Sequence, residues 1–231
     1  MLKCAAERAG KENENDRAFD RRYSYTRTKV TEFRNAKGDL KKREEKKKVN
    51  EPSAGSAASA TEPTVAPTRS PKDSERNEPV TDTHSNVRGK AFERRDFYLN
   101  NDLLGRFEIT LTGREILNGR SALVVDFKPA NKKLPERNLK DRFINKAAGR
   151  VWLDEADCAL AKADLYLTEQ VNVVGGLVGA VWKFNYTFSR ERTVDGFWFT
   201  RAVDWHLEGR EFIVRRVVDY HEERTDVRQA W

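Results

Sequence analysis

Polar and apolar residues alternate along much of the chain, with the period of two that is typical of half-buried β-strands. In the clearest run every second residue is aromatic: Trp182, Phe184, Tyr186 and Phe188. Similar alternation covers Phe107–Leu111, Leu123–Phe127 and Val203–Leu207. Because turn signals separate these runs, the pattern predicts an antiparallel meander of hairpins.

The turn signals divide the chain into about nine strands. Asn118-Gly119 accepts the positive φ angles of a type I′ turn, and further turns are expected at Asn35–Asp39, Asp154–Asp157, Asp195-Gly196 and Glu208-Gly209. The strands expected between them are Tyr23–Phe33, Leu40–Val49, Phe107–Leu111, Leu123–Phe127, Val151–Leu153, Ala159–Val171, Trp182–Phe188, Phe197–Leu207 and Phe212–Tyr220.

Helices are expected at Leu2–Phe19, Ala91–Leu104 and, as a short helix or lid, Lys132–Asn145. Their apolar positions have to cover one face of the strands. The predicted fold class is therefore α+β, with one large curved antiparallel sheet wrapped around a few short helices. No stretch approaches the roughly 20 apolar residues that a membrane-spanning helix needs.

The segment Asn50–Lys90 has a different composition, with five of the seven prolines and no aromatic residue. Such a segment cannot bury enough apolar surface to order itself. The two strands before it would be only marginally stable as an isolated hairpin, so we expect them to join the later strands. This predicts a single domain over residues 1–231, with a flexible Ser/Ala/Thr/Pro-rich insertion at 50–90.

The chain of 231 residues is basic, with 44 Lys and Arg against 37 Asp and Glu, a formal net charge of +7. Cations concentrate at Lys41–Lys48, where Glu44 and Glu45 interrupt them. Anionic lipid or nucleic acid could bind such a run, but a solvated edge strand is the favoured interpretation, because charge protects an edge from pairing. Nucleic acid is not expected as a partner.

Candidate chemistry is sparse. The acidic residues around one turn (Asp154, Glu155, Asp157 and Asp164) could do acid–base work, or could simply form a turn between strands. His206 and His221 are expected on the polar sides of strands, without an evident partner. The motifs G-x-S-x-G and H-E-x-x-H do not occur. We therefore expect no enzyme activity, no catalytic residues, no metal and no cofactor.

Several short motifs resemble bacterial outer-membrane lipoprotein-sorting-like proteins, the LolA/LolB-like periplasmic carriers. They are Gly149-Arg150-Val151-Trp152-Leu153-Asp154, Gly175-Gly176-Leu177, Gly196-Phe197-Trp198 and Asp219-Tyr220. The resemblance implies a half-open barrel whose concave face holds acyl chains beneath helices that act as a lid. It also implies a periplasmic location, with the signal sequence absent from this chain. In that compartment Cys4 and Cys158 could pair, which the sequence alone leaves open.

On this interpretation, the candidate cavity-lining residues are Trp182, Phe184, Tyr186, Phe188, Phe107, Ile109 and Phe127. The alternative is ordinary core packing. The apolar loop with Gly175, Gly176, Leu177 and Gly179 is a candidate gate, or else a buried turn or glycine bulge. The expected function is a carrier of lipid or of lipoprotein acyl chains, with transient membrane contact. The alternative is a non-enzymatic cell-envelope scaffold or sensor domain that binds a protein partner.

Overall fold

The structure, a computed structural model, describes residues 2–52, 101–173, 176 and 179–230. The chain divides into one compact unit of Met1–Pro52 and Phe92–Trp231 and a second unit, Ser53–Ala91. Beyond Pro52, the predicted insertion at 50–90 lies outside the described residues, as does the first part of the expected helix Ala91–Leu104.

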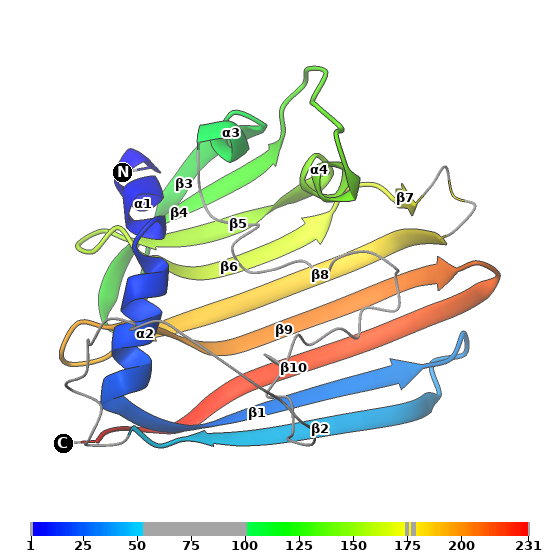
Figure 1. Ribbon diagram of the computed structural model, residues 1–231. Coiled ribbons are helices and arrows are strands. Elements are labelled where there is room, and N and C mark those ends of the chain that lie inside the picture. Colours follow the sequence, from blue (N-terminus) through cyan, green and yellow to red (C-terminus); the bar gives the residue numbers. More distant parts are fainter. Residues whose placement is uncertain (1, 53–100, 174–175, 177–178, 231) are drawn as a thin grey trace, which may run out of the picture. The chain divides into compact units, whose positions relative to one another are not determined.

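The first unit contains one ten-stranded antiparallel sheet (Figure 1). Its strands are β1 (Tyr23–Arg34), β2 (Leu40–Asn50), β3 (Phe107–Leu117), β4 (Arg120–Pro129), β5 (Ala147–Asp154), β6 (Leu160–Leu167), β7 (Val171–Val173), β8 (Gly179–Arg192), β9 (Trp198–Glu211) and β10 (Val214–Gln229). The order is β2-β1-β10-β9-β8-β6-β5-β4-β3, with β7 beside β8. The sheet is open, and β1 and β2 belong to it, as the sequence predicts. The structure shows that they join it through β10. The α+β class is confirmed.

Four of the five predicted turns connect strands as expected, and one is wrong. Asn118 and Gly119 have φ angles of 50° and 75°, as a type I′ hairpin requires. By contrast, β9 continues through Gly209, and the chain turns only at Phe212-Ile213. Gly209 is needed because β8 approaches closely: a Cβ there would lie 2.5 Å from the Ala180 carbonyl oxygen. The expected strand Ala159–Val171 is likewise divided into β6 and β7.

The expected N-terminal helix is two helices, α1 (Leu2–Ala9) and α2 (Glu12–Arg22), which are separated at Gly10. The later helices are α3 (Asn101–Leu104) and α4 (Leu139–Ile144). Only the last part of the expected segment Lys132–Asn145 is helical. Its start is fixed by Asn138, whose side chain accepts a hydrogen bond from the Asp141 amide at 2.9 Å.

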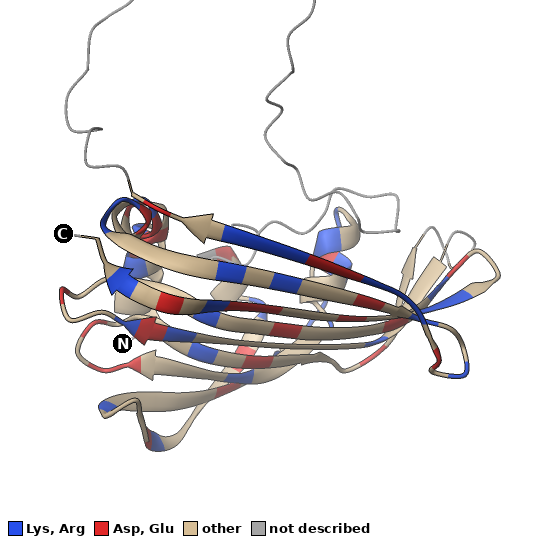
Figure 2. Ribbon diagram, turned by 90° about the horizontal axis from the view of Figure 1, so that it is seen from below, with Lys and Arg blue, Asp and Glu red and all other residues tan. Residues whose placement is uncertain are grey.

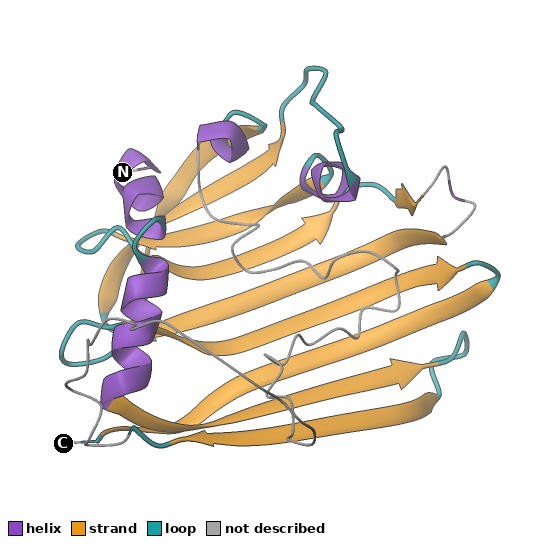
Figure 3. Ribbon diagram, viewed as in Figure 1, coloured by secondary structure: helices purple, strands orange, loops and turns teal. Residues whose placement is uncertain are grey.

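The helices α1 and α2 cover one face of the sheet, towards one end of its strands (Figure 3). Ala5 of α1 packs against Val125 and Leu153. Phe19 of α2 stacks on Phe199, with ring centroids 4.9 Å apart, and belongs to the same core cluster as Tyr23 and Tyr25. We call this side of the sheet the helix-covered face.

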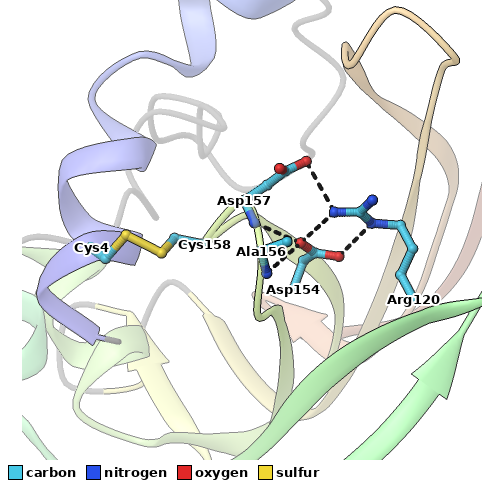
Figure 4. Close-up of a disulfide and its surroundings, with 6 residues drawn as sticks. All are labelled: Cys4, Arg120, Asp154, Ala156, Asp157 and Cys158. Atoms are coloured by element: carbon cyan, nitrogen blue, oxygen red, sulfur yellow. Dashed lines mark hydrogen bonds and ion pairs between the residues drawn. A yellow bond between two sulfur atoms is a disulfide. The ribbon is translucent and has the colours of Figure 1, made fainter.

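A disulfide between Cys4 and Cys158 ties α1 to the turn between β5 and β6 (Figure 4). The turn itself is held by Asp154, whose carboxylate is 1% exposed. That carboxylate accepts two hydrogen bonds from Arg120, at 2.6 and 2.8 Å. It also accepts backbone N–H bonds from Ala156 and Asp157. Helix α1 is therefore fixed covalently to a rigid turn.

Candidate ligand-binding face

One line of neighbouring residues crosses the sheet on the helix-covered face. Directly paired residues on adjacent antiparallel strands point to the same side, so the strand register identifies the line. It consists of Ile109, Phe127, Gly149, Leu165, Tyr186, Trp205, Tyr220 and Thr31. Six steps of about 4.8 Å separate Ile109 from Tyr220, or about 29 Å along the sheet. From Ile109 to Tyr220, seven strands thus present a continuous, mostly apolar surface, and we call these seven residues the apolar line.

Five aromatic side chains on β8, β9 and β10 form the densest part of this face. Trp205 and Tyr220 are stacked with centroids 5.1 Å apart, while Phe184 lies 6.4 Å from both Tyr186 and Trp205. All five are only partly buried, whereas Phe19 in the core beneath α2 is 1% exposed. We call this group the aromatic row: Phe184, Tyr186, Phe188, Trp205 and Tyr220.

A glycine, an alanine and Leu165 lie between the aromatic row and Phe127 on β4. Gly149 occupies the position on β5 next to Phe127, and Ala163 on β6 pairs with Phe188. Glycine is required at 149, because a Cβ would lie 2.1 Å from the Asp164 carbonyl oxygen. On this line β5 therefore carries no side chain beside Phe127, whereas Leu165 on β6 adds apolar bulk before Tyr186.

A charged cluster ends the aromatic row at β1. Arg27 donates two hydrogen bonds to Glu222, at 2.6 and 2.8 Å, and the Tyr220 hydroxyl donates a third at 2.6 Å. Burial alone would raise the pKa of Glu222, but the hydrogen bonds and charge of Arg27 lower it. Glu222 thus stays ionised and orients Tyr220 within the row.

The residues predicted from β3 and β4 also lie on the helix-covered face. Phe107 and Phe127 meet edge to face, with centroids 4.9 Å apart. Ile109 packs against the cluster beneath α1. Ile109 therefore contributes to the core at the helix-covered end, while Phe127 lies on the apolar line beside Gly149.

Trp182 does not share this face with the other three aromatics of β8. The register with β9 shifts between Val181 and Lys183, which marks a bulge at Trp182. The Trp182 ring, 37% exposed, lies under the Arg215 guanidinium at 5.7 Å, and Arg215 also binds Glu208. The strict alternation expected from Trp182 to Phe188 therefore holds only from Phe184 onward.

The candidate gate is described only in part. Gly175 and Leu177 lie outside the described residues. Gly176 has a φ of 89°, and its carbonyl accepts a hydrogen bond from Arg210 at 2.6 Å. Gly179 is not in a loop but begins β8, where a Cβ would lie 2.7 Å from the Arg210 carbonyl oxygen.

The acidic residues of the β5–β6 turn are engaged in ion pairs. Asp157 accepts hydrogen bonds from Arg192 at 2.6 Å and from the Trp198 indole at 2.9 Å. Glu155 pairs with Arg114 at 2.9 Å. Asp164 is 3.1 Å from Lys162 on the same strand, and so takes no part in the turn. These contacts, with those of Asp154, give the acidic residues a structural role.

Both strand histidines have carboxylate partners, which the sequence did not indicate. On the face opposite the helices, His206 Nδ1 lies 2.6 Å from Asp219, and His221 Nδ1 lies 2.6 Å from Asp204. These four residues line a shallow cavity of about 360 Å³. Both strands carry aspartate and histidine in the order Asp-x-His, and antiparallel pairing therefore places each histidine directly opposite the aspartate of the other strand.

Glu208, beside these pairs, has a strongly perturbed pKa. Hydrogen bonds from His206, Arg215 and Lys183 lower the pKa of Glu208 to about 2. The three donors lie 2.9–3.2 Å from its two oxygens. The ionised form is therefore part of the folded structure at neutral pH.

Sequence reasoning missed Trp205 and Tyr220 as members of the site. The alternation from Val203 to Leu207 predicts a strand that contains Trp205, but it does not place Trp205 in the cavity. Because Tyr186, Trp205 and Tyr220 are direct register neighbours, their grouping depends on pairing between distant segments. The signal available in the sequence was their position on the apolar side of β9 and β10.

No family model and no curated protein matches this chain. Among solved structures, it is similar to a putative outer membrane lipoprotein-sorting protein domain from Vibrio parahaemolyticus (12% identity, 99% of this chain and 93% of that chain, TM-score 0.34). It is also similar to a DUF1329 family protein from Desulfovibrio piger ATCC 29098 (15%, 99% and 92%, TM-score 0.35) and to a LolA superfamily protein from Nitrosomonas europaea (9%, 94% and 93%, TM-score 0.30).

Two of these proteins, the lipoprotein-sorting domain and the LolA superfamily protein, are described by the names of the group that the sequence motifs resemble. No helix in the described part of the chain is long and apolar enough to cross a membrane.

Proposed function

We propose that this protein is a periplasmic carrier that holds a lipid, or the acyl chains of a lipoprotein, against the helix-covered face. The observation that carries the proposal is the apolar line with its partly exposed aromatic row. Apolar side chains that water can still reach gain free energy when a hydrophobic ligand covers them, because both surfaces leave water.

The size of this surface suits an acyl chain. The hydrocarbon core of a bilayer is about 30 Å thick, so that each leaflet contributes about 15 Å of chain. The apolar line extends about 29 Å, about twice the length of such a chain. Each buried methylene group contributes about 0.8 kcal/mol. Gly149 leaves room beside Phe127, and Leu165 adds apolar surface before Tyr186. A chain of about 15 Å that lies from β4 to β8, three strand spacings or about 14 Å apart, would therefore contact Phe127 at one end and Tyr186 at the other.

The disulfide supports the proposed compartment. Disulfides persist in the periplasm and outside cells, and are rare in the cytosol. Cys4 and Cys158 are bonded in the structure, and the bond fixes α1 over the helix-covered face. An oxidising compartment would thus keep α1 packed on Val125 and Leu153, beside one end of the apolar line.

The test is native mass spectrometry of protein directed to the periplasm, followed by lipid extraction of the same sample. We expect a co-purifying acylated species that is lost in Phe184→Asp. The matched control is Asn185→Asp, which places the same charge on the next residue of β8 but on the opposite face; it should keep the ligand. A wild-type protein that takes up neither phospholipid nor lipopeptide, or equal loss in both variants, would contradict the proposal.

A protein-binding scaffold is the second candidate function, and edge strand β2 favours it. Among the described strands β2 pairs only with β1, and Figure 2 shows Lys and Arg along it. Lys47 and Lys48 are exposed and point to opposite faces. If an acidic envelope protein binds here, Lys47→Glu with Lys48→Glu should abolish its capture while ligand uptake is unchanged. Unchanged capture would exclude β2 as the binding surface.

A further inference from the structure

The hairpin between β9 and β10 ends in three consecutive exposed apolar residues. Phe212, Ile213 and Val214 are 56%, 96% and 49% exposed. Phe212 has a φ of 53°, a left-handed conformation that turns the chain here. Single exposed apolar residues are ordinary, but a contiguous exposed group needs an explanation. We call these three residues the apolar tip.

Cations flank the apolar tip on both strands. Residues Arg210–Arg216 carry three arginines and one glutamate, a net charge of 3 − 1 = +2. Arg210 donates to the Phe212 carbonyl at 2.7 Å and so stiffens the turn. Arg215 and Arg216 pair with Glu208 and Glu211, at 2.9 and 3.4 Å, and their side chains are still 45% exposed. The tip is thus an apolar wedge with a basic rim.

The β1–β2 turn adds further cations at the same end of the sheet. Arg34, at the end of β1, pairs with Val217, close to the start of β10, and both turns lie at the same side in Figure 1. The segment Asn35–Lys42 carries Lys37, Lys41 and Lys42 against Asp39, a net charge of 3 − 1 = +2. Leu40, the first residue of β2, is 48% exposed. The basic, partly apolar character therefore extends across neighbouring strands.

This end is the one away from α2. Asn15 of α2 hydrogen-bonds the Trp198 backbone at the start of β9, at 2.5 and 3.1 Å. From Trp198, β9 continues for thirteen residues, or about 44 Å, to its last residue, Glu211. The apolar tip follows directly after Glu211. On the helix-covered face, Phe184 is the member of the aromatic row on β8 that is nearest the tip, and Leu207 is its register partner on β9. The tip therefore lies where that face is open with respect to α1 and α2.

We propose that the apolar tip docks on the surface of a bilayer that contains anionic phospholipid. Phe212, Ile213 and Val214 enter the boundary between headgroups and acyl chains, and the flanking cations bind lipid phosphates. Apolar side chains beside basic ones are the combination that holds peripheral proteins in this layer, through apolar burial and attraction to anionic lipid. The docking would bring the open end of the helix-covered face to the membrane. Only this last consequence rests on the proposed carrier function.

The experiment is co-sedimentation of the full chain with vesicles of phosphatidylcholine, with and without phosphatidylglycerol. Wild-type protein should bind the anionic vesicles, and less strongly as salt rises. Ile213→Glu should weaken binding at least about tenfold, because an apolar contact is lost and a like charge is added. The matched control is Val194→Glu, in the β8–β9 turn at the other end of β9. Val194 is 99% exposed, and its replacement should leave binding unchanged.

Three results would overturn the docking proposal. They are wild-type protein that does not bind anionic vesicles, equal binding to neutral vesicles, and equal loss in Ile213→Glu and Val194→Glu. The carrier function fails separately: uptake of an acyl probe from solution, without vesicles, tests it alone. Ile213→Glu should take up this probe as wild type does. Circular dichroism and the melting temperature of each variant confirm that the fold is intact.

Discussion

Reduction of the Cys4–Cys158 disulfide should destabilise the protein strongly. The bond joins residues 154 positions apart, so it removes much of the conformational freedom of the unfolded chain. The chain-entropy relation gives about 17 cal/mol/K for a loop of this length, or about 5 kcal/mol at 25 °C. Natural domains are stable by about 5–15 kcal/mol. The disulfide would therefore supply a large part of the total.

The assay is urea unfolding, followed by tryptophan fluorescence, with and without dithiothreitol. For a urea m-value of about 2–3 kcal/mol/M, the midpoint should fall by about 2 M on reduction. Cys4→Ala, Cys158→Ala and the double variant should lose the same free energy, because all three remove one shared bond. Reduced protein with an unchanged midpoint would refute the reasoning. Loss in Cys158→Ala alone would assign the effect to packing of that side chain.

Three further predictions concern single residues. Gly149→Ala should lower the free energy of unfolding by about 1–3 kcal/mol, measured in urea, because its Cβ would meet the Asp164 carbonyl oxygen at 2.1 Å; wild-type stability would contradict the close approach. Asp154→Asn should lower the free energy of unfolding by about 3–5 kcal/mol in the same assay, because Arg120 loses a buried charged partner. A loss below about 1 kcal/mol would mean that this ion pair contributes no more than an exposed salt bridge. Glu208 has its pKa lowered to about 2, so its stabilising effect is complete above the unfolded pKa of about 4.5 and is lost as pH falls towards 2. Glu208→Gln should therefore melt below wild type at pH 7, and the gap should close near pH 2; a constant gap would exclude this linkage.

The aromatic row illustrates how much of the site the sequence predicts. Alternation with period two is local, so it places Phe184, Tyr186 and Phe188 on one face without any knowledge of the neighbours. The same alternation gives Trp205 a face on β9. It does not reveal that the two faces coincide, because that depends on which residue of β8 pairs with which residue of β9.

By itself, the sequence determined the class of fold, most strand positions and the type I′ turn at Asn118-Gly119, because these depend on residues close together in the chain. Tertiary structure decided the rest. The bulge turned Trp182 towards Arg215, and close packing against β8 kept Gly209 within a strand. Cys4 and Cys158 met because the fold of the intervening chain brought α1 to the β5–β6 turn. Each of these outcomes depends on contacts between segments far apart in sequence, and no local pattern records such contacts.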